Sequence, residues 1–136
     1  MNKKRWFFAS IAAFVTATVL ELIFNHFCLK GIYAQTASLW RPEAEMMNLM
    51  PHYWVASFVA SFIFVYIYTK GYEAKPCGYG EGLRFGLLMG LFTILPMVTI
   101  TYATMPVPLR LPLDWFATGV AEYLIVGAVV GLIYKK

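Results

Sequence analysis

The sequence predicts an all-α polytopic membrane protein, built as one domain over residues 1–136 with four transmembrane helices in a bundle. Two observations carry this prediction. Of the 136 residues, 60% are hydrophobic and only 13% are charged, which lies outside the range of soluble domains. A hydrocarbon core of about 30 Å needs roughly 20 apolar residues per helix, and the chain offers four such windows. The expected helices are 6–27, 51–69, 83–105 and 113–134.

The first helix, 6–27, follows a basic run at residues 3–5. Its apolar stretch is longer than the core of a signal peptide and ends without an A-x-A-like cleavage site, so we expect a retained helix. Glu21 interrupts this stretch, and Asn25 lies four residues further on. On a helix the two side chains share one face, which must point at protein groups or water rather than at lipid.

The connection from residue 28 to residue 50 is too long for a hairpin and mixes apolar with polar residues. We expect an interfacial segment with Trp40 at headgroup depth, broken in two at Arg41-Pro42 because the residue before proline avoids the helical region. The second helix should begin at Pro51, which suits a first turn, and carries Ser57 on a polar stripe.

The third and fourth helices carry small residues at a spacing of four. This spacing permits close backbone approach, so we expect the two helices to pack tightly, against each other or against a second protomer. The glycines are Gly82, Gly86, Gly90, Gly127 and Gly131.

Charged residues near the starts of these two helices predict local contacts. Glu81 and Arg84 are expected to form a local ion pair. Asp114 is expected to be the N-cap of the fourth helix.

Lys and Arg set the expected orientation, with both termini cytoplasmic. The basic residues of the cytoplasmic side are Lys3, Lys4, Arg5, Lys70, Lys75, Arg84, Lys135 and Lys136, against Lys30, Arg41 and Arg110 on the outer side. In this topology Cys28 and Cys77 lie on opposite sides of the membrane and cannot pair.

Two carboxylates, Glu21 and Glu122, fall inside the apolar windows at about the same depth, roughly 9 to 10 Å below the outer boundary. We expect them to face one polar pocket with Asn25, Ser57 and Thr99 nearby. Two close carboxylates in a low dielectric should not both ionise. A purely structural alternative is that each carboxyl group bonds a neighbouring helix and locks the bundle.

Metal binding is a second interpretation of the same region. Glu21 and Glu122 with His26 and His52 make a ligand set typical of zinc or non-haem iron, although His26 lies about 140° round the helix from Glu21. Thioethers in the run 46–52, Met47 and Met50 among them, are typical ligands of Cu(I) but also suit adaptable apolar packing. The sequence identifies no cofactor.

Several function classes are disfavoured. No basic stripe is interleaved with stacking aromatics, which argues against nucleic-acid binding, and no C-x-x-C motif is present. The stretch Gly78-Tyr79-Gly80 lacks the lysine and spacing of a phosphate-binding loop. No catalytic triad or cofactor fingerprint is evident, which favours a non-enzymatic role.

At residues 29–33 (LKGIY), 39–42 (LWRP) and 81–86 (EGLRFG), the sequence resembles a family of small, uncharacterised four-span proteins of the bacterial inner membrane. The resemblance covers nearly the whole length. It implies a multi-pass topology in that membrane and supplies no catalytic residues.

Three hypotheses follow. The first is a non-enzymatic binding module or accessory subunit with the lipid bilayer around it, working as a homo-oligomer or within a larger membrane complex. The second is a proton-coupled small-molecule transporter, by analogy with small exporters that carry a carboxylate in their first helix. The third is a metal-dependent membrane enzyme.

Overall fold

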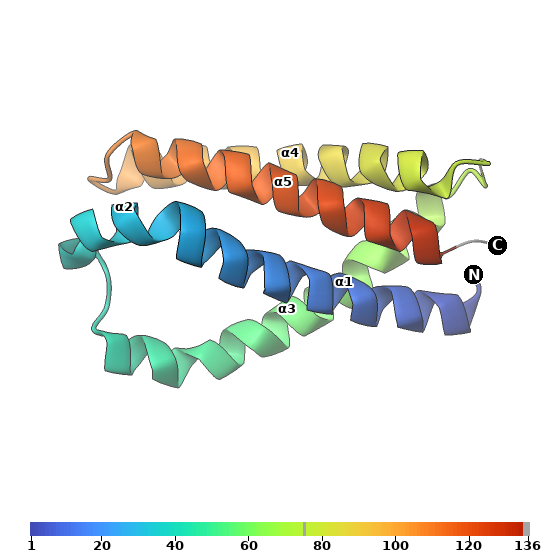
Figure 1. The fold of residues 1–136 in the computed structure, drawn as a ribbon, viewed down its shortest axis with the longest axis horizontal. Coiled ribbons are helices and arrows are strands. Elements are labelled where there is room, and N and C mark those ends of the chain that lie inside the picture. The colour runs from blue at the N-terminus through green and yellow to red at the C-terminus, as the bar shows by residue number, and fades with distance from the viewer. Residues whose placement is uncertain (75, 135–136) are drawn as a thin grey trace.

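The computed structural model describes residues 1–74 and 76–134, which form long helices and contain no strand (Figure 1). The elements are α1 (Lys3–Phe24), the π-helical turn η1 (Asn25–Leu29), α2 (Lys30–Gln35), the 3-10 turn η2 (Ala37–Leu39), α3 (Glu43–Gly71), α4 (Gly78–Thr104) and α5 (Arg110–Ile133). α1, η1 and α2 run on without a break, so the described residues make four helical segments, each long and apolar enough to cross a membrane.

The start of α1 and the end of α5 lie at one end of the bundle, as an even number of spans requires (Figure 1). We call this the terminal end, and the opposite end, where α2 and the start of α3 lie, the distal end. Cys28 in η1 and Cys77 before α4 are both exposed and lie at opposite ends.

The start of α3 differs from the prediction. The helix begins at Glu43, eight residues before Pro51, with Pro42 at the N-cap position and Pro51 inside the helix. Glu43 and Glu45 in the first turn stabilise the exposed N–H groups of this earlier start. The segment 28–50 is therefore divided between an extension of the first helix and the first turns of α3, and it breaks at residues 40–42, as the Arg41-Pro42 pair predicted.

The last helix also begins earlier than expected. α5 starts at Arg110, so Asp114 lies inside the helix and is not its N-cap. Its carboxylate instead forms an ion pair with Arg110 one turn earlier, at 3.4 Å. The stiff proline-rich link was expected to continue to residue 112, but the chain turns at Leu109, where the Leu111 N–H donates to the Pro108 carbonyl at 3.0 Å.

The core of the terminal half joins all four long helices. Its buried residues are Ala9, Ala13, Phe64, Val65, Tyr68, Val126, Val130 and Tyr134. Aromatic rings link α3 to α4 here, since the Phe64 and Tyr68 rings lie 4.8 and 5.2 Å from that of Phe85. The small side chains of α1 let the other helices approach its backbone.

α4 and α5 pack backbone to backbone within one chain. A Cβ atom built on Gly127 would lie 2.8 Å from the Gly86 Cα, and one built on Gly131 would lie 2.9 Å from the Gly82 Cα. Neither partner is a side chain that can rotate away. Gly90 faces the Tyr123 side chain instead, with its hypothetical Cβ 3.0 Å from the Tyr123 Cβ.

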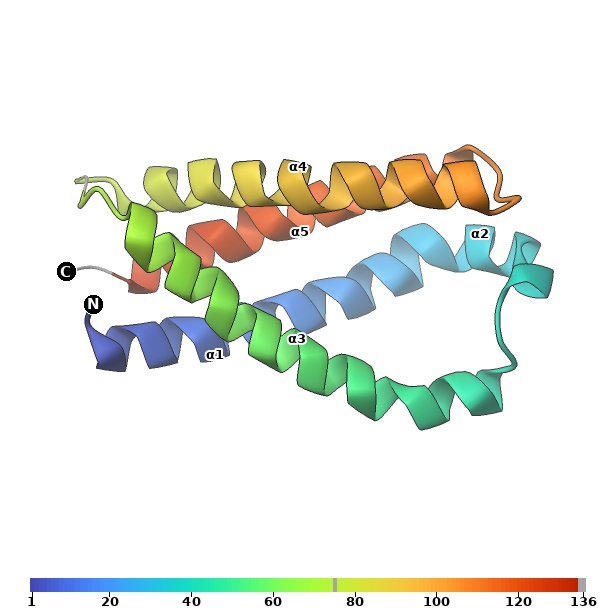
Figure 2. The same cartoon turned by 180° about the vertical axis from the view of Figure 1, so that it is seen from behind.

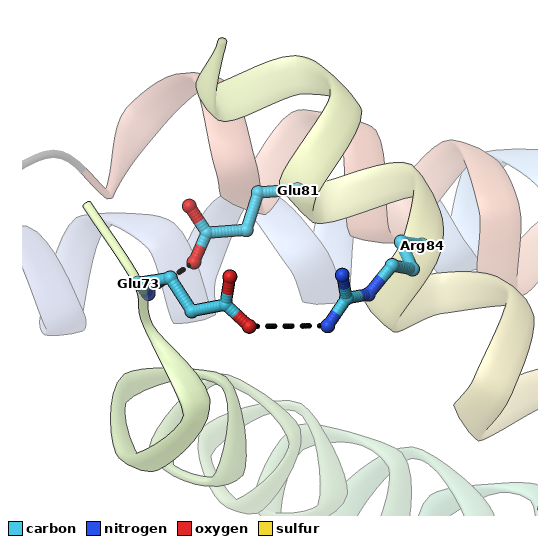
Figure 3. A network of polar contacts seen from close by, with 3 residues as sticks. All are labelled: Glu73, Glu81 and Arg84. Carbon is cyan, nitrogen blue, oxygen red and sulfur yellow. Dashed lines mark hydrogen bonds and ion pairs between the residues drawn. The ribbon is translucent and has the colours of Figure 1, made fainter. Parts of the chain in front are cut away.

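A polar network closes the α3–α4 loop at the terminal end (Figure 3). The Arg84 guanidinium pairs with the Glu73 carboxylate at 3.1 Å, and the Glu73 N–H donates to the Glu81 carboxylate at 2.6 Å. The predicted Glu81–Arg84 pair is therefore replaced, because the loop carries Glu73 toward both side chains. Of the basic residues used to predict the orientation, Lys75, Lys135 and Lys136 lie outside the described residues.

The distal half is held by three aromatic side chains, Tyr33, Trp40 and Trp115, which we call the distal aromatic cap. The Trp115 Nε1–H donates to the Tyr33 hydroxyl at 2.8 Å, and the Trp40 Nε1–H donates to the Thr36 hydroxyl at 2.9 Å. The rings of Trp40 and Trp115 lie 6.0 Å apart. The cap covers a small buried cluster, and it ties α2 to the start of α5.

Candidate functional site

A cavity of 270 Å³ lies among the four long helices. We call it the acidic cavity. Small and apolar side chains form most of its wall. Its lining residues are Ala13, Ala17, Thr18 and Glu21 of α1; Tyr53, Ser57, Ala60, Ser61 and Phe64 of α3; Ile94 of α4; and Gly119, Glu122, Tyr123 and Val126 of α5.

Glu21 and Glu122 reach this cavity from different helices. Glu21 comes from the last turns of α1, and Glu122 from the middle of α5. Both side chains are partly buried. Counting residues from the membrane boundary predicted one depth for the two carboxylates, and in the structure both line one half-open space together with Ser57.

Tyr53 completes the polar wall, and the sequence pattern did not predict this role for it. Its hydroxyl donates a hydrogen bond to the Glu21 carboxylate, joining α3 to α1. The predicted helix start at Pro51 placed Tyr53 at the membrane interface, where tyrosine is common. The signal that points to it is the spacing of four between Tyr53 and Ser57, which puts both on the cavity face of α3.

The hydroxyl groups around the carboxylates are oriented by their own helices. Ser61 donates to the Ser57 carbonyl at 2.9 Å, and Thr18 donates to the Phe14 carbonyl at 2.9 Å. Their oxygen lone pairs remain to accept from a ligand. Among the residues that line the cavity in the described ranges, none is Lys, Arg or His. The site therefore offers hydrogen-bond acceptors and two carboxyl groups, with no basic side chain in its described lining.

Asn25 and Thr99 do not line the acidic cavity, contrary to expectation. Asn25 opens the π-helical turn η1 and faces a second space nearer the distal end. Thr99 is exposed, and its hydroxyl donates to the Leu95 carbonyl of its own helix at 2.8 Å. The cavity face of α4 is that of Ile94, and five residues on, Thr99 points about 140° away.

The proposed metal ligands are not brought together. Within residues 1–74 and 76–134, no three His, Cys, Asp or Glu side chains form a group that can hold a metal ion. Neither His26 nor His52 lines the acidic cavity, and the His26 ring packs against Phe27 with ring centroids 4.8 Å apart. Met47 is 62% exposed, whereas Met50 lines the second space described next.

The second space, of 860 Å³, lies at the distal end, and we call it the distal hollow. Half of its lining residues are aromatic or thioether side chains. Its lining residues are Asn25, Tyr33, Ala37, Trp40, Arg41, Pro42, Glu43, Met46, Met50 and Trp115. The distal aromatic cap thus forms one wall, and the first turns of α3 form another.

The four long apolar helices and the polar cavity among them define the class of the molecule: a multi-pass, all-α membrane protein. No family model, curated protein or solved structure matches the chain. The resemblance to bacterial four-span proteins at residues 29–33, 39–42 and 81–86 therefore stays a prediction.

Proposed function

We propose that this protein is a non-enzymatic membrane binding module that holds a small organic cation, an ammonium compound, in the acidic cavity. One observation carries the proposal: Glu21, Glu122 and the Tyr53 hydroxyl line a single intramembrane cavity whose described lining includes no basic side chain. An ionisable residue at this depth is costly to place and is usually functional.

Charge balance defines the ligand class. An ionised carboxylate in an apolar interior is stable only when a partner neutralises it, and an ammonium group supplies both charge and hydrogen-bond donors. The rings of Phe64 and Tyr123 also line the cavity, and aromatic faces attract cations. The volume of 270 Å³ is just below the range of roughly 300 to 1,000 Å³ usual for ligand pockets, which suits a small head group.

Binding is favoured over transport because the terminal half beyond the cavity is closely packed. Val65, Tyr68, Val130 and Tyr134 are at most 1% exposed. A proton-coupled transporter, the second candidate from the sequence, requires alternating access through this half. Uptake of labelled methylammonium into proteoliposomes under an imposed proton gradient would favour that candidate instead.

The binding experiment uses the full chain in lipid nanodiscs, with methylammonium as the probe and calorimetry as the readout. Glu122→Gln and Glu21→Gln should each weaken binding by at least about tenfold, since a buried charged partner is worth about 1.5 to 3 kcal/mol. Glu45→Gln is the matched control, because Glu45 pairs with Arg41 at the exposed start of α3. Equal binding by all four proteins, or none by the wild type, would overturn the proposal.

We also propose that the terminal end faces the cytoplasm of a bacterial cell, with the protein in the inner membrane. Lys3, Lys4, Arg5, Lys70 and Arg84 lie toward that end, against Lys30, Arg41 and Arg110 toward the other, and a cytoplasmic excess of basic residues is the usual pattern. An impermeant thiol reagent on intact cells should label Cys28 and spare Cys77. The reverse pattern would invert the orientation.

Assembly into a homo-oligomer or a larger membrane complex remains part of the proposal. α3 offers an apolar outward face for it, since Trp54, Val55 and Val59 are each more than half exposed. Native mass spectrometry from nanodiscs should show more than one protomer. A monomer at every concentration would contradict self-assembly and would mean that lipid covers this face.

A further inference from the structure

We infer that the cation held by this site is amphiphilic, with its ammonium head in the acidic cavity and an apolar tail in the distal hollow. This inference rests on the proposed function and adds the shape and chemistry of the ligand beyond its head group. It comes from the position of the two spaces on the same pair of helices.

The two spaces follow one another along α1 and α3. Along the continuous first helical segment, the acidic cavity ends at Glu21 of α1 and the distal hollow begins at Asn25 of η1, one turn further on. On α3 the hollow ends at Met50 and the cavity begins at Tyr53, again within one turn. At 1.5 Å per residue these steps are about 4.5 to 6 Å, which is the length of a few methylene groups.

Tyr53 and Glu21 lie at the junction of the two spaces. They are the residues of α3 and α1 that line the acidic cavity closest to the distal end, and the Tyr53 hydroxyl donates to the Glu21 carboxylate across it. An ammonium head entering from the hollow meets this hydrogen bond first. It competes with Tyr53 for the carboxylate and then lies between Glu21 and Glu122.

The wall of the distal hollow suits an alkyl or aromatic tail. Trp40 and Trp115 supply flat apolar surface, and Met46 and Met50 supply flexible thioethers that fit irregular shapes. The hollow has a volume of 860 Å³, against 270 Å³ for the acidic cavity. The larger space therefore receives the tail, which is the bulkier part of the ligand.

The charges at the hollow disfavour a phospholipid head group. Arg41 is its one basic lining residue in the described chain, and the Arg41 guanidinium is paired with Glu45 at 3.5 Å. Glu43 adds a carboxylate to the same wall. A phosphate therefore meets a wall without excess positive charge, whereas an ammonium passes toward two carboxylates.

The test compares methylammonium with octylammonium on the full chain in nanodiscs, with the signal of protein-free nanodiscs subtracted as the lipid-partition background. Wild-type protein should bind octylammonium at least about tenfold more tightly, because each buried methylene contributes up to about 0.8 kcal/mol. Met46→Trp, which fills the hollow, should abolish that gain and leave methylammonium binding within about twofold. Met47→Trp, the neighbouring residue outside the hollow, should change neither.

Each result has a defined meaning. If wild-type protein binds neither amine, the proposed function itself fails. If methylammonium binds but octylammonium gains nothing, or Met46→Trp weakens both amines equally, the cation site stands and the tail site is wrong. Competition by octyl phosphate as strong as that by octylammonium would overturn the cationic class of the ligand.

A second variant keeps the test decisive if Met46→Trp fails to fold. Ala37→Trp blocks the hollow from η2, and Ala34→Trp, at an exposed position that does not line the hollow, is its control.

Discussion

The pair α4 and α5 and the pair α1 and α3 use the same kind of apolar sequence in opposite ways. α4 and α5 contact each other through their backbones, whereas α1 and α3 cross and then diverge toward the distal end (Figure 2). Nothing fits between the first pair at the glycines. The second pair leaves room for the acidic cavity and, beyond it, the distal hollow.

Residue size along each pair accounts for the difference. Glycines on both α4 and α5 let the two helices touch, while on α1 the small residues Ala9 and Ala13 are buried and Glu21 follows further along. In a membrane the hydrophobic effect does not drive helices together, because lipid tails are as apolar as the helices. Small residues, which permit close backbone contact, therefore determine where the helices meet.

The largest expected effect tests the close contact. Gly127→Ala should lower the free energy of unfolding by about 3 kcal/mol, because the new Cβ meets backbone that cannot move aside. Denaturation in mixed micelles followed by circular dichroism measures this loss. Gly31→Ala is the control: its Cβ meets nothing within 4 Å, and the change should be neutral or stabilising by up to about 1 kcal/mol. Similar losses of stability in the two variants would mean that the close glycine contact between α4 and α5 does not stabilise the fold.

Tyr53→Phe tests the junction between the two diverging helices. Removing the hydroxyl that donates to Glu21 should cost about 1.5 kcal/mol in the same denaturation assay, because the acceptor is a carboxylate. Tyr102→Phe on α4, whose side chain is 49% exposed, should change stability little. If the two variants behave alike, the Tyr53–Glu21 bond does not hold α3 to α1.

Gly119→Ala makes the comparison within one helix. Gly119 lies eight residues before Gly127 on α5, but its hypothetical Cβ meets the Ile94 side chain, at 2.9 Å from Cδ1. Ile94 lines the acidic cavity and can rotate into it. We expect a loss of about 0.5 kcal/mol or less, against several times that at Gly127. A loss of stability as large as that of Gly127→Ala would show that the Ile94 side chain cannot move into the cavity.

The smallest expected effect concerns the terminal end. The Arg84 and Glu73 side chains of the polar network are 64% and 46% exposed, so Arg84→Ala should cost about 0.5 kcal/mol or less. Thermal unfolding in detergent at low and at high salt measures it. A loss comparable to that of Gly127→Ala would mean that charges, rather than glycines, hold this end together.

The sequence predicted what depends on position along a helix axis. Four apolar windows became four helical segments long and apolar enough to cross a membrane, and Glu21 and Glu122, for which a rise of 1.5 Å per residue predicted one depth, line one cavity. Rotation about the axis was not predictable in this way. The face that α3 turns to the bundle depends on how it crosses α1, so Tyr53 was missed.

Two other misses have local causes. Asn25 is the first residue of a π-helical turn, and a turn of this type shifts the face of the residues around it away from the usual spacing of four. In the distal half of α4 the buried residue is Val98, and Thr99 is one step of about 100° away from it. A pattern of polar residues gave no sign of either rotation.

The distal aromatic cap gives the protein an optical reporter of its own. Two of the four tryptophans in the chain, Trp40 and Trp115, line the distal hollow. The other two lie elsewhere, Trp6 near the terminal end and Trp54 on the outward face of α3. In a protein with Trp6 and Trp54 replaced by Phe, the tryptophan emission would therefore come only from the hollow. Quenching by a brominated alkyl chain would then register, in emitted light, whether that chain has entered.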